Sequence, residues 1–132
     1  MLEQNQRQPI ESVLARHPEI EMAILFGSIA TGRAGYHSDV DLAVAAGQPI
    51  KREEKIALIE ELAEATGRPI DLIDLAEAGE PLLGQILKRG KRLFGTDRSY
   101  AELVIRHLVD DADFMPYYRR ILGERRRAWI GQ

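Results

Sequence analysis

Two short motifs in the first third of the chain combine residue types that can bind a phosphate and a metal ion. Gly27 and Ser28 follow an apolar run, and Asp39 and Asp41 stand after a further ten residues. A glycine at a strand end lets the backbone turn tightly and expose N–H groups to an anion, and a serine adds a hydroxyl donor. The first motif therefore predicts a phosphate-binding turn.

The two aspartates are two residues apart on a predicted strand, so both side chains leave the same face. Neighbouring carboxylates raise each other's pKa unless a cation lies between them, and Mg²⁺ accepts oxygen ligands while leaving positions open for substrate phosphates. Alone, Gly-Ser would be an ordinary turn and Asp-x-Asp an ordinary charged strand end. In this order and spacing, Gly27, Ser28, Asp39 and Asp41 predict metal-assisted nucleotidyl transfer.

A third carboxylate for the same site is expected in the stretch "PIDLIDL", which offers Asp71 and Asp74. Strand alternation places these two side chains on opposite faces, so both cannot reach one metal ion. A carboxylate inside a strand is costly to bury unless it is paired or bound to metal, which favours Asp71. Asp74, at the strand end, is then expected to be solvated or to cap the backbone.

The elements that must position these residues follow from hydrophobic periodicity. Helices are predicted at 6–18, 51–67 and 80–90, and strands at 20–27, 39–46, 68–75 and 91–95. The apolar stripe of the second helix is expected to be Ile56, Ile59, Leu62 and Ala63. This order predicts an α/β or α+β fold, in which a small mixed sheet is flanked by helices.

Composition narrows the class of protein. The 132 residues include no cysteine, which excludes disulfides and thiolate metal sites. The N-terminus lacks the features of a signal peptide, and no apolar run is long enough to span a bilayer. The sequence therefore predicts a cytoplasmic protein without membrane contact.

The chain divides into a predicted core domain, residues 1–96, and a helical C-terminal segment, residues 97–132. The last sixteen residues hold five arginines and one glutamate, a charge of +4, whereas the rest of the chain carries −7. Tyr117, Ile121, Leu122 and Trp129 form an apolar stripe among these arginines. The segment is expected to pack on its own core, to form a dimer contact or to bind a partner.

The motif "GSIATGRAGYHSDVDLAV" resembles the signature of the DNA polymerase beta-like nucleotidyltransferase superfamily, and in particular its minimal nucleotidyltransferase branch. The similar element order extends from about Ile10 to Phe94. Relatives often carry a basic residue at the position of Thr31, so the neighbouring Arg33 is expected to take over a triphosphate contact. The resemblance implies that the nucleotide is bound by Gly27, Ser28, Arg33 and Ser38. It also implies that the metal-binding and catalytic residues are Asp39, Asp41 and Asp71.

This resemblance implies a Mg²⁺-dependent enzyme that transfers AMP from ATP to a hydroxyl group. Minimal nucleotidyltransferases of prokaryotes often act as antitoxins that AMPylate a tyrosine of a HEPN-type RNase toxin, with C-terminal helical segments docked on it. Two alternatives stay open: an antitoxin that neutralises its partner by binding alone, and a nucleotidyltransferase acting on a small molecule. The protein is expected to form a homo- or hetero-oligomer in some of these cases. Direct binding of nucleic acid is not expected.

Overall fold

A four-stranded sheet forms the centre of the molecule. The computed structural model describes residues 4–27 and 38–111. Within this part of the chain the strands run in the spatial order β3-β2-β1-β4. Their bounds are β1 Met22–Phe26, β2 Val40–Ala45, β3 Ile70–Asp74 and β4 Lys91–Phe94. All four strands predicted from the sequence are confirmed, and each is one to three residues shorter in total than predicted.

The strands pair in two directions. β1 is antiparallel to both β2 and β4, whereas β2 and β3 are parallel. In this register Phe26 stands opposite Asp41 on one side, and Asp41 stands opposite Asp71 on the other. The predicted small mixed sheet is therefore confirmed, and its pairing aligns two of the candidate carboxylates.

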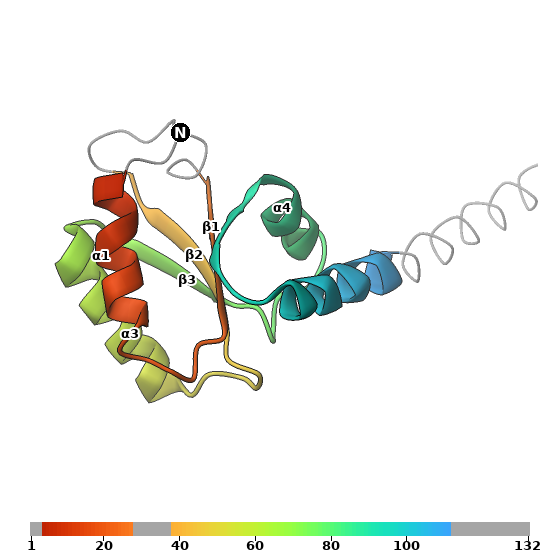
Figure 1. Cartoon of the computed structure of the whole chain (residues 1–132), viewed down its shortest axis with the longest axis horizontal. Coiled ribbons are helices and arrows are strands. Elements are labelled where there is room, and N and C mark those ends of the chain that lie inside the picture. The colour runs from red at the N-terminus through yellow and green to blue at the C-terminus, as the bar shows by residue number, and fades with distance from the viewer. Residues whose placement is uncertain (1–3, 28–37, 112–132) are drawn as a thin grey trace, which may run out of the picture.

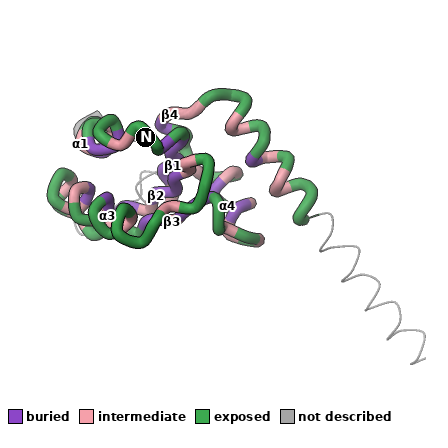
Figure 2. The backbone as a smooth tube through the Cα atoms, turned by 90° about the horizontal axis from the view of Figure 1, so that it is seen from below, coloured by how far each residue is buried: buried purple, intermediate pink, exposed green. Residues whose placement is uncertain are grey.

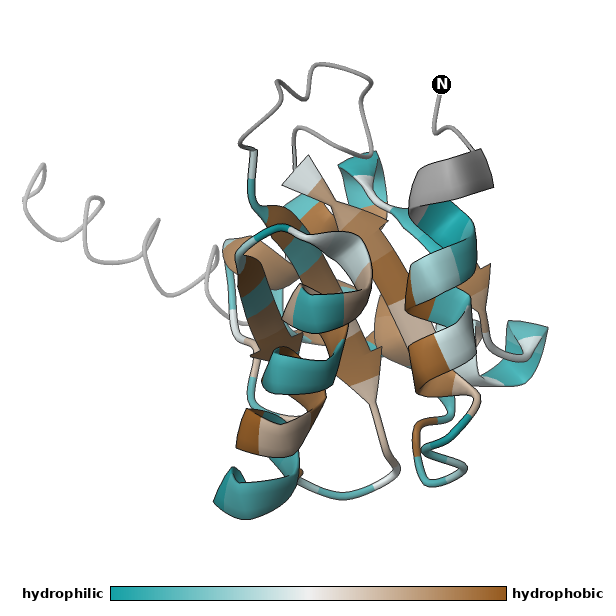
Figure 3. Cartoon of the chain, turned by 90° about the vertical axis from the view of Figure 1, so that its left-hand side faces the viewer, coloured by the Kyte–Doolittle hydropathy of each residue, from teal (hydrophilic) through white to brown (hydrophobic). Residues whose placement is uncertain are grey.

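Helices cover both faces of the sheet (Figure 1). α1 (Gln4–Leu14) and α3 (Arg52–Thr66) pack on one face. α4 (Leu82–Arg89) and the helical residues 97–111 lie on the other. Figure 3 shows the outer surfaces of the helices as mostly hydrophilic around hydrophobic strands.

Strand alternation divides the apolar core into two layers. Val40, Leu42 and Val44 of β2 face the layer under α1 and α3, and Ala43 faces the layer under α4. Figure 2 shows the buried residues concentrated in the strands between the two helical layers. Asp41 alternates with Val40 and Leu42, so its side chain belongs to the α4 face of the sheet.

The predicted apolar stripe of α3 is partly wrong. Leu62 is buried as expected, but the second buried residue is Leu58, whereas Ile56 is 46% exposed. Lys55 and Thr66 are half-buried on the same side of the helix. A lysine can cover apolar surface with its alkyl stem, so the buried face includes a residue that the apolar pattern does not mark.

The helix of residues 97–111 is attached to the core at its inner face. Leu103 is buried against the α4 layer, and Arg106 Nη2 donates to the carbonyl oxygens of Leu75 at 2.5 Å and Ala78 at 3.0 Å. The apolar stripe predicted from Tyr117 to Trp129 lies outside the described residues, and the boundary after residue 96 stays a prediction. Among the helices described, none is long and apolar enough to cross a membrane.

Candidate active site

The first side of the site is a close approach between Gly27 and Asp41. Gly27 follows the last residue of β1 and has a φ of 76°, a left-handed conformation that favours glycine. A Cβ atom placed on it would lie 2.0 Å from Oδ2 and 2.8 Å from Cγ of Asp41. Because no side chain fits there, the backbone at the end of β1 lies directly against the Asp41 carboxylate.

Asp41 and Asp71 stand side by side on the parallel strands β2 and β3. The pKa of Asp41 is raised above its ordinary value, mainly because the group is partly buried. Repulsion from Asp71 and then from Asp39 adds to this effect. A hydrogen bond in which the protonated Asp41 carboxyl donates to Asp71 also contributes. Three acidic groups therefore share one end of the sheet.

Asp39 precedes β2 and is exposed. The neighbouring backbone is fixed by the start of β3, because the Val40 N–H donates to the carbonyl oxygen of Pro69 at 2.8 Å. The structure thus brings together three of the predicted site residues, Asp39, Asp41 and Asp71, with Gly27 beside them.

Asp74 has a different environment from Asp71. It is only 5% exposed, and its two carboxylate oxygens accept hydrogen bonds from the backbone N–H groups of Ile50 at 2.8 Å and Ala76 at 2.9 Å. The predicted capping role is confirmed, whereas the prediction of a solvated side chain is wrong. The argument that burial singles out Asp71 is also wrong, because Asp71 is exposed. The face of the strand, rather than the depth of burial, separates the two residues.

Two of the predicted nucleotide-binding residues lie in the segment 28–37, outside the described residues. These are Ser28 and Arg33, together with Thr31, which departs from the pattern of relatives. The described residues Gly27 and Ser38 mark the two ends of this segment. Sequence reasoning missed Arg68, whose Nη1 donates to the carbonyl oxygen of Ser38 at 3.1 Å. No pattern in the sequence predicts this contact, because it joins residues 30 positions apart.

The donor set fits a hard divalent cation shared with substrate phosphates. Among the described residues, no group of three or more His, Asp or Glu side chains is placed to hold a metal ion by itself. Mg²⁺ is usually held by one or two carboxylates together with phosphate oxygens and water, so a complete cage is not required. The repulsion that raises the pKa of Asp41 is the kind that a cation between the carboxylates relieves.

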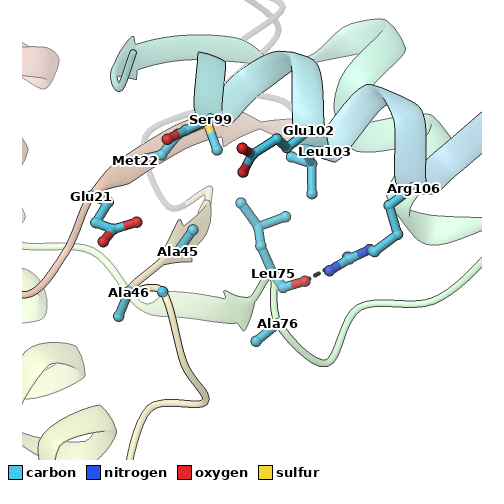
Figure 4. A pocket seen from close by; sticks show the side chains of 11 residues that line it. Glu21, Met22, Ala45, Ala46, Leu75, Ala76, Ser99, Glu102, Leu103 and Arg106 are labelled. Carbon is cyan, nitrogen blue, oxygen red and sulfur yellow. Dashed lines mark hydrogen bonds between the residues drawn. The ribbon is translucent and has the colours of Figure 1, made fainter. Parts of the chain in front are cut away.

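A cavity of about 270 Å³ lies at the opposite end of the sheet (Figure 4). Its lining includes Glu21 and Met22 at the start of β1, Ala45 at the end of β2, and Leu103 and Arg106 of the helix 97–111. None of the candidate carboxylates contributes to it. The candidate aspartates therefore lie at the end of the sheet beside Gly27 and not in this cavity.

The chain belongs to the family described as polymerase beta nucleotidyltransferase, which matches residues 8–99. The fold and the clustered aspartates are those expected for this class, and the chain is a nucleotidyltransferase. Membership of the family implies a divalent metal ion in general.

Among known proteins, the chain resembles the protein adenylyltransferase MntA of Shewanella oneidensis. The two are 32% identical over 98 residues, which cover 74% of this chain and 70% of the relative. A crystal structure of a toxin-antitoxin with AMP-PNP has a chain that is 26% identical, with a TM-score of 0.78 over 89% of this chain and 96% of that one.

A second similar structure is that of a tri-AMPylated Shewanella oneidensis HEPN toxin in complex with MNT antitoxin. The matched chain is 24% identical, with a TM-score of 0.70 over 90% of this chain and 97% of that one. At this level of identity the likeness supports the fold alone.

Proposed function

We propose that the protein is a Mg²⁺-dependent protein adenylyltransferase that acts as an antitoxin. It transfers AMP from ATP to a tyrosine hydroxyl of a HEPN-type RNase toxin, in the cytoplasm where ATP is available. The observation that carries the proposal is the alignment of Asp41 with Asp71, with the pKa of Asp41 raised by burial and by its acidic neighbours. The resemblance to MntA supports the choice of acceptor.

Each residue of the site has a role in this reaction. Asp39 and Asp41 hold Mg²⁺, and Asp71 completes the metal site and accepts the proton of the attacking hydroxyl. Gly27, Ser28, Arg33 and Ser38 bind the triphosphate. The metal ion, when bound, neutralises the phosphate charge that develops as the acceptor oxygen bonds to the α-phosphorus and pyrophosphate leaves.

The helix of residues 97–111 provides a surface for the protein acceptor. Three large apolar side chains on this helix are strongly exposed: Ile105 by 58%, Leu108 by 58% and Val109 by 51%. Residues three and four positions apart share one face of a helix, so these side chains form a continuous apolar strip. We define Ile105, Leu108 and Val109 as the apolar strip and propose that it docks on the toxin.

The proposal is tested by incubating the protein with Mg²⁺, α-labelled ATP and the HEPN-type protein encoded beside it. We expect label on a tyrosine of that protein, and we expect Asp39→Asn to abolish the label. Asp97→Asn is the matched control, because Asp97 is 98% exposed on its side chain and lies outside the site. It should label the partner as the unchanged protein does.

The competing function is neutralisation by binding alone, which the exposed apolar strip would also serve. It predicts a stable complex without transferred label, and toxin neutralisation that Asp39→Asn leaves intact. That pair of results would overturn the adenylyltransferase proposal. Label on a small alcohol in place of the partner would overturn the choice of acceptor.

A further inference from the structure

We propose that Arg68 is a positioning residue that holds Asp39 in place for metal binding. The inference rests on the proposed function, in which Asp39 is a metal ligand. Arg68 lies in the turn between α3 and β3, far from Asp39 in sequence. Its guanidinium reaches the backbone next to Asp39, where Nη1 donates to the carbonyl oxygen of Ser38 at 3.1 Å.

The turn that carries Arg68 is itself well fixed. α3 ends at Gly67, which has a φ of 68° and whose N–H donates to the carbonyl oxygen of Ala63 at 2.8 Å. The Thr66 hydroxyl donates to the carbonyl oxygen of Leu62 at 2.8 Å and accepts the N–H of Arg68 at 3.2 Å. The backbone at the base of the Arg68 side chain is therefore held by the helix end.

Two contacts from this turn bracket Asp39. The Arg68 guanidinium binds the carbonyl of Ser38 on one side, and the carbonyl of Pro69 accepts the N–H of Val40 on the other. Asp39 itself lies outside the paired residues of β2 and β3, which begin at Val40 and Ile70. The Arg68 contact and the Val40 bond therefore both fix the described backbone around Asp39.

The same turn leads directly into the strand that carries Asp71. It therefore relates the position of one candidate ligand, Asp39, to that of another, Asp71, across the parallel pair. Groups that orient metal ligands without touching the metal commonly change metal affinity or activity by about 10–100-fold when they are removed. Arg68 acts on Asp39 in this way, through the backbone of Ser38.

The test measures metal affinity rather than turnover. Binding of Mn²⁺, in the presence of a non-hydrolysable ATP analogue, is followed by electron paramagnetic resonance. We expect Arg68→Met to raise the Mn²⁺ dissociation constant about 10–100-fold, since methionine retains an unbranched stem but has no donor. Arg68→Lys retains the charge and a donor but not the planar guanidinium. Its Mn²⁺ dissociation constant should lie between those of the unchanged protein and Arg68→Met. Arg98→Met, at a 90% exposed side chain, is the control and should bind as the unchanged protein does.

A double-mutant comparison separates positioning from a general structural effect. If Arg68 acts through Asp39, Arg68→Met should weaken Mn²⁺ binding much less in an Asp39→Asn background than in an Asp71→Asn background. Equal losses in both backgrounds, or no loss for Arg68→Met alone, would overturn the inference. If Asp39→Asn by itself leaves Mn²⁺ affinity unchanged, the metal role of Asp39 in the proposed function fails as well.

Discussion

At one end of the sheet a glycine and a carboxylate lie close together. Gly27 has no side chain, and a Cβ atom there would overlap Oδ2 of Asp41. Its positive φ adds a second requirement for glycine at the same position. Glycine is therefore required at position 27 for two reasons: the backbone turn after β1 and the room that the Asp41 carboxylate occupies.

Replacing Gly27 by alanine should impair both stability and transfer. The left-handed backbone alone costs about 1–3 kcal/mol for a residue with a Cβ atom, and displacement of Asp41 should remove most of the AMP transfer. Denaturant unfolding and the labelled-ATP assay measure the two effects. Gly79→Ala is the control, because no atom beyond its own chain neighbours lies within 4 Å of the added Cβ. Normal transfer by Gly27→Ala would contradict a role for this contact.

Asp71 and Asp74 should respond to mutation in opposite ways. Asp71→Asn should abolish AMP transfer but leave the free energy of unfolding unchanged or raise it, because it relieves repulsion with Asp41. Asp74→Ala should lower the free energy of unfolding by about 2–4 kcal/mol, because the N–H groups of Ile50 and Ala76 lose their acceptors. Urea unfolding and the transfer assay distinguish the two. A strongly destabilised Asp71→Asn would argue against the assignment.

Among the elements, the helix of residues 97–111 has two apolar sides with different roles. Leu103 points into the core, and Arg106 binds two backbone carbonyls beyond the end of β3. The apolar strip faces away from that contact and is exposed. The helix is thus attached firmly enough to present its outer side to a partner.

A charge in the apolar strip should weaken partner binding without unfolding the protein. We expect Leu108→Asp to reduce affinity for the HEPN-type partner by about 2 kcal/mol, or about thirtyfold, as for a central interface residue. Calorimetric titration measures this, and thermal melting checks the fold. Ile56→Asp is the matched control, since Ile56 is a similarly exposed apolar residue on α3. Equal losses for both variants would exclude a specific role of the strip.

The sequence predicts the elements well because their periodicity is local. β2 alternates as expected, since Val40, Leu42 and Val44 face one layer while Ala43 faces the other. The face of α3 is predicted less well, because Lys55 and Thr66 lie on its buried side beside Leu58 and Leu62. An apolar count cannot identify a half-buried lysine, whose stem can cover apolar surface.

The parts of the site that the sequence does not reveal are contacts between elements. The motif spacing identifies Asp39 and Asp41, and strand alternation separates Asp71 from Asp74. The parallel register of β2 with β3 follows from packing of the whole sheet, and so does the contact of Arg68 with Ser38. Burial of Asp74 also depends on a distant loop, because its partner Ile50 lies 24 residues earlier.

At the scale of the whole molecule, three of the described carboxylates lie together at the end of the sheet beside Gly27. Asp39, Asp41 and Asp71 stand there, while the cavity under the helix of residues 97–111 lies at the other end. The stability of the metal-free protein should therefore depend on pH partly through this end of the sheet.

Asp41→Asn should remove part of that pH dependence. Because folding raises the pKa of Asp41, the stability it contributes is fully present below the ordinary carboxyl pKa and is lost as the pH rises through the raised value. The variant should therefore gain stability over the unchanged protein at neutral pH, and the gain should shrink on acidification. Urea unfolding in the presence of a chelator, repeated across this range, measures it. Parallel pH curves for the two proteins would contradict the prediction.

The five residues of β3 carry two aspartates that are three positions apart and face opposite sides of the sheet. Inserting or deleting a single residue between them would turn both onto the same face. The strand would then either lose its acceptor for the loop at Ile50 or carry a second charge beside Asp41. Active relatives should therefore have no insertion or deletion within β3, even where its apolar residues are replaced by other apolar residues.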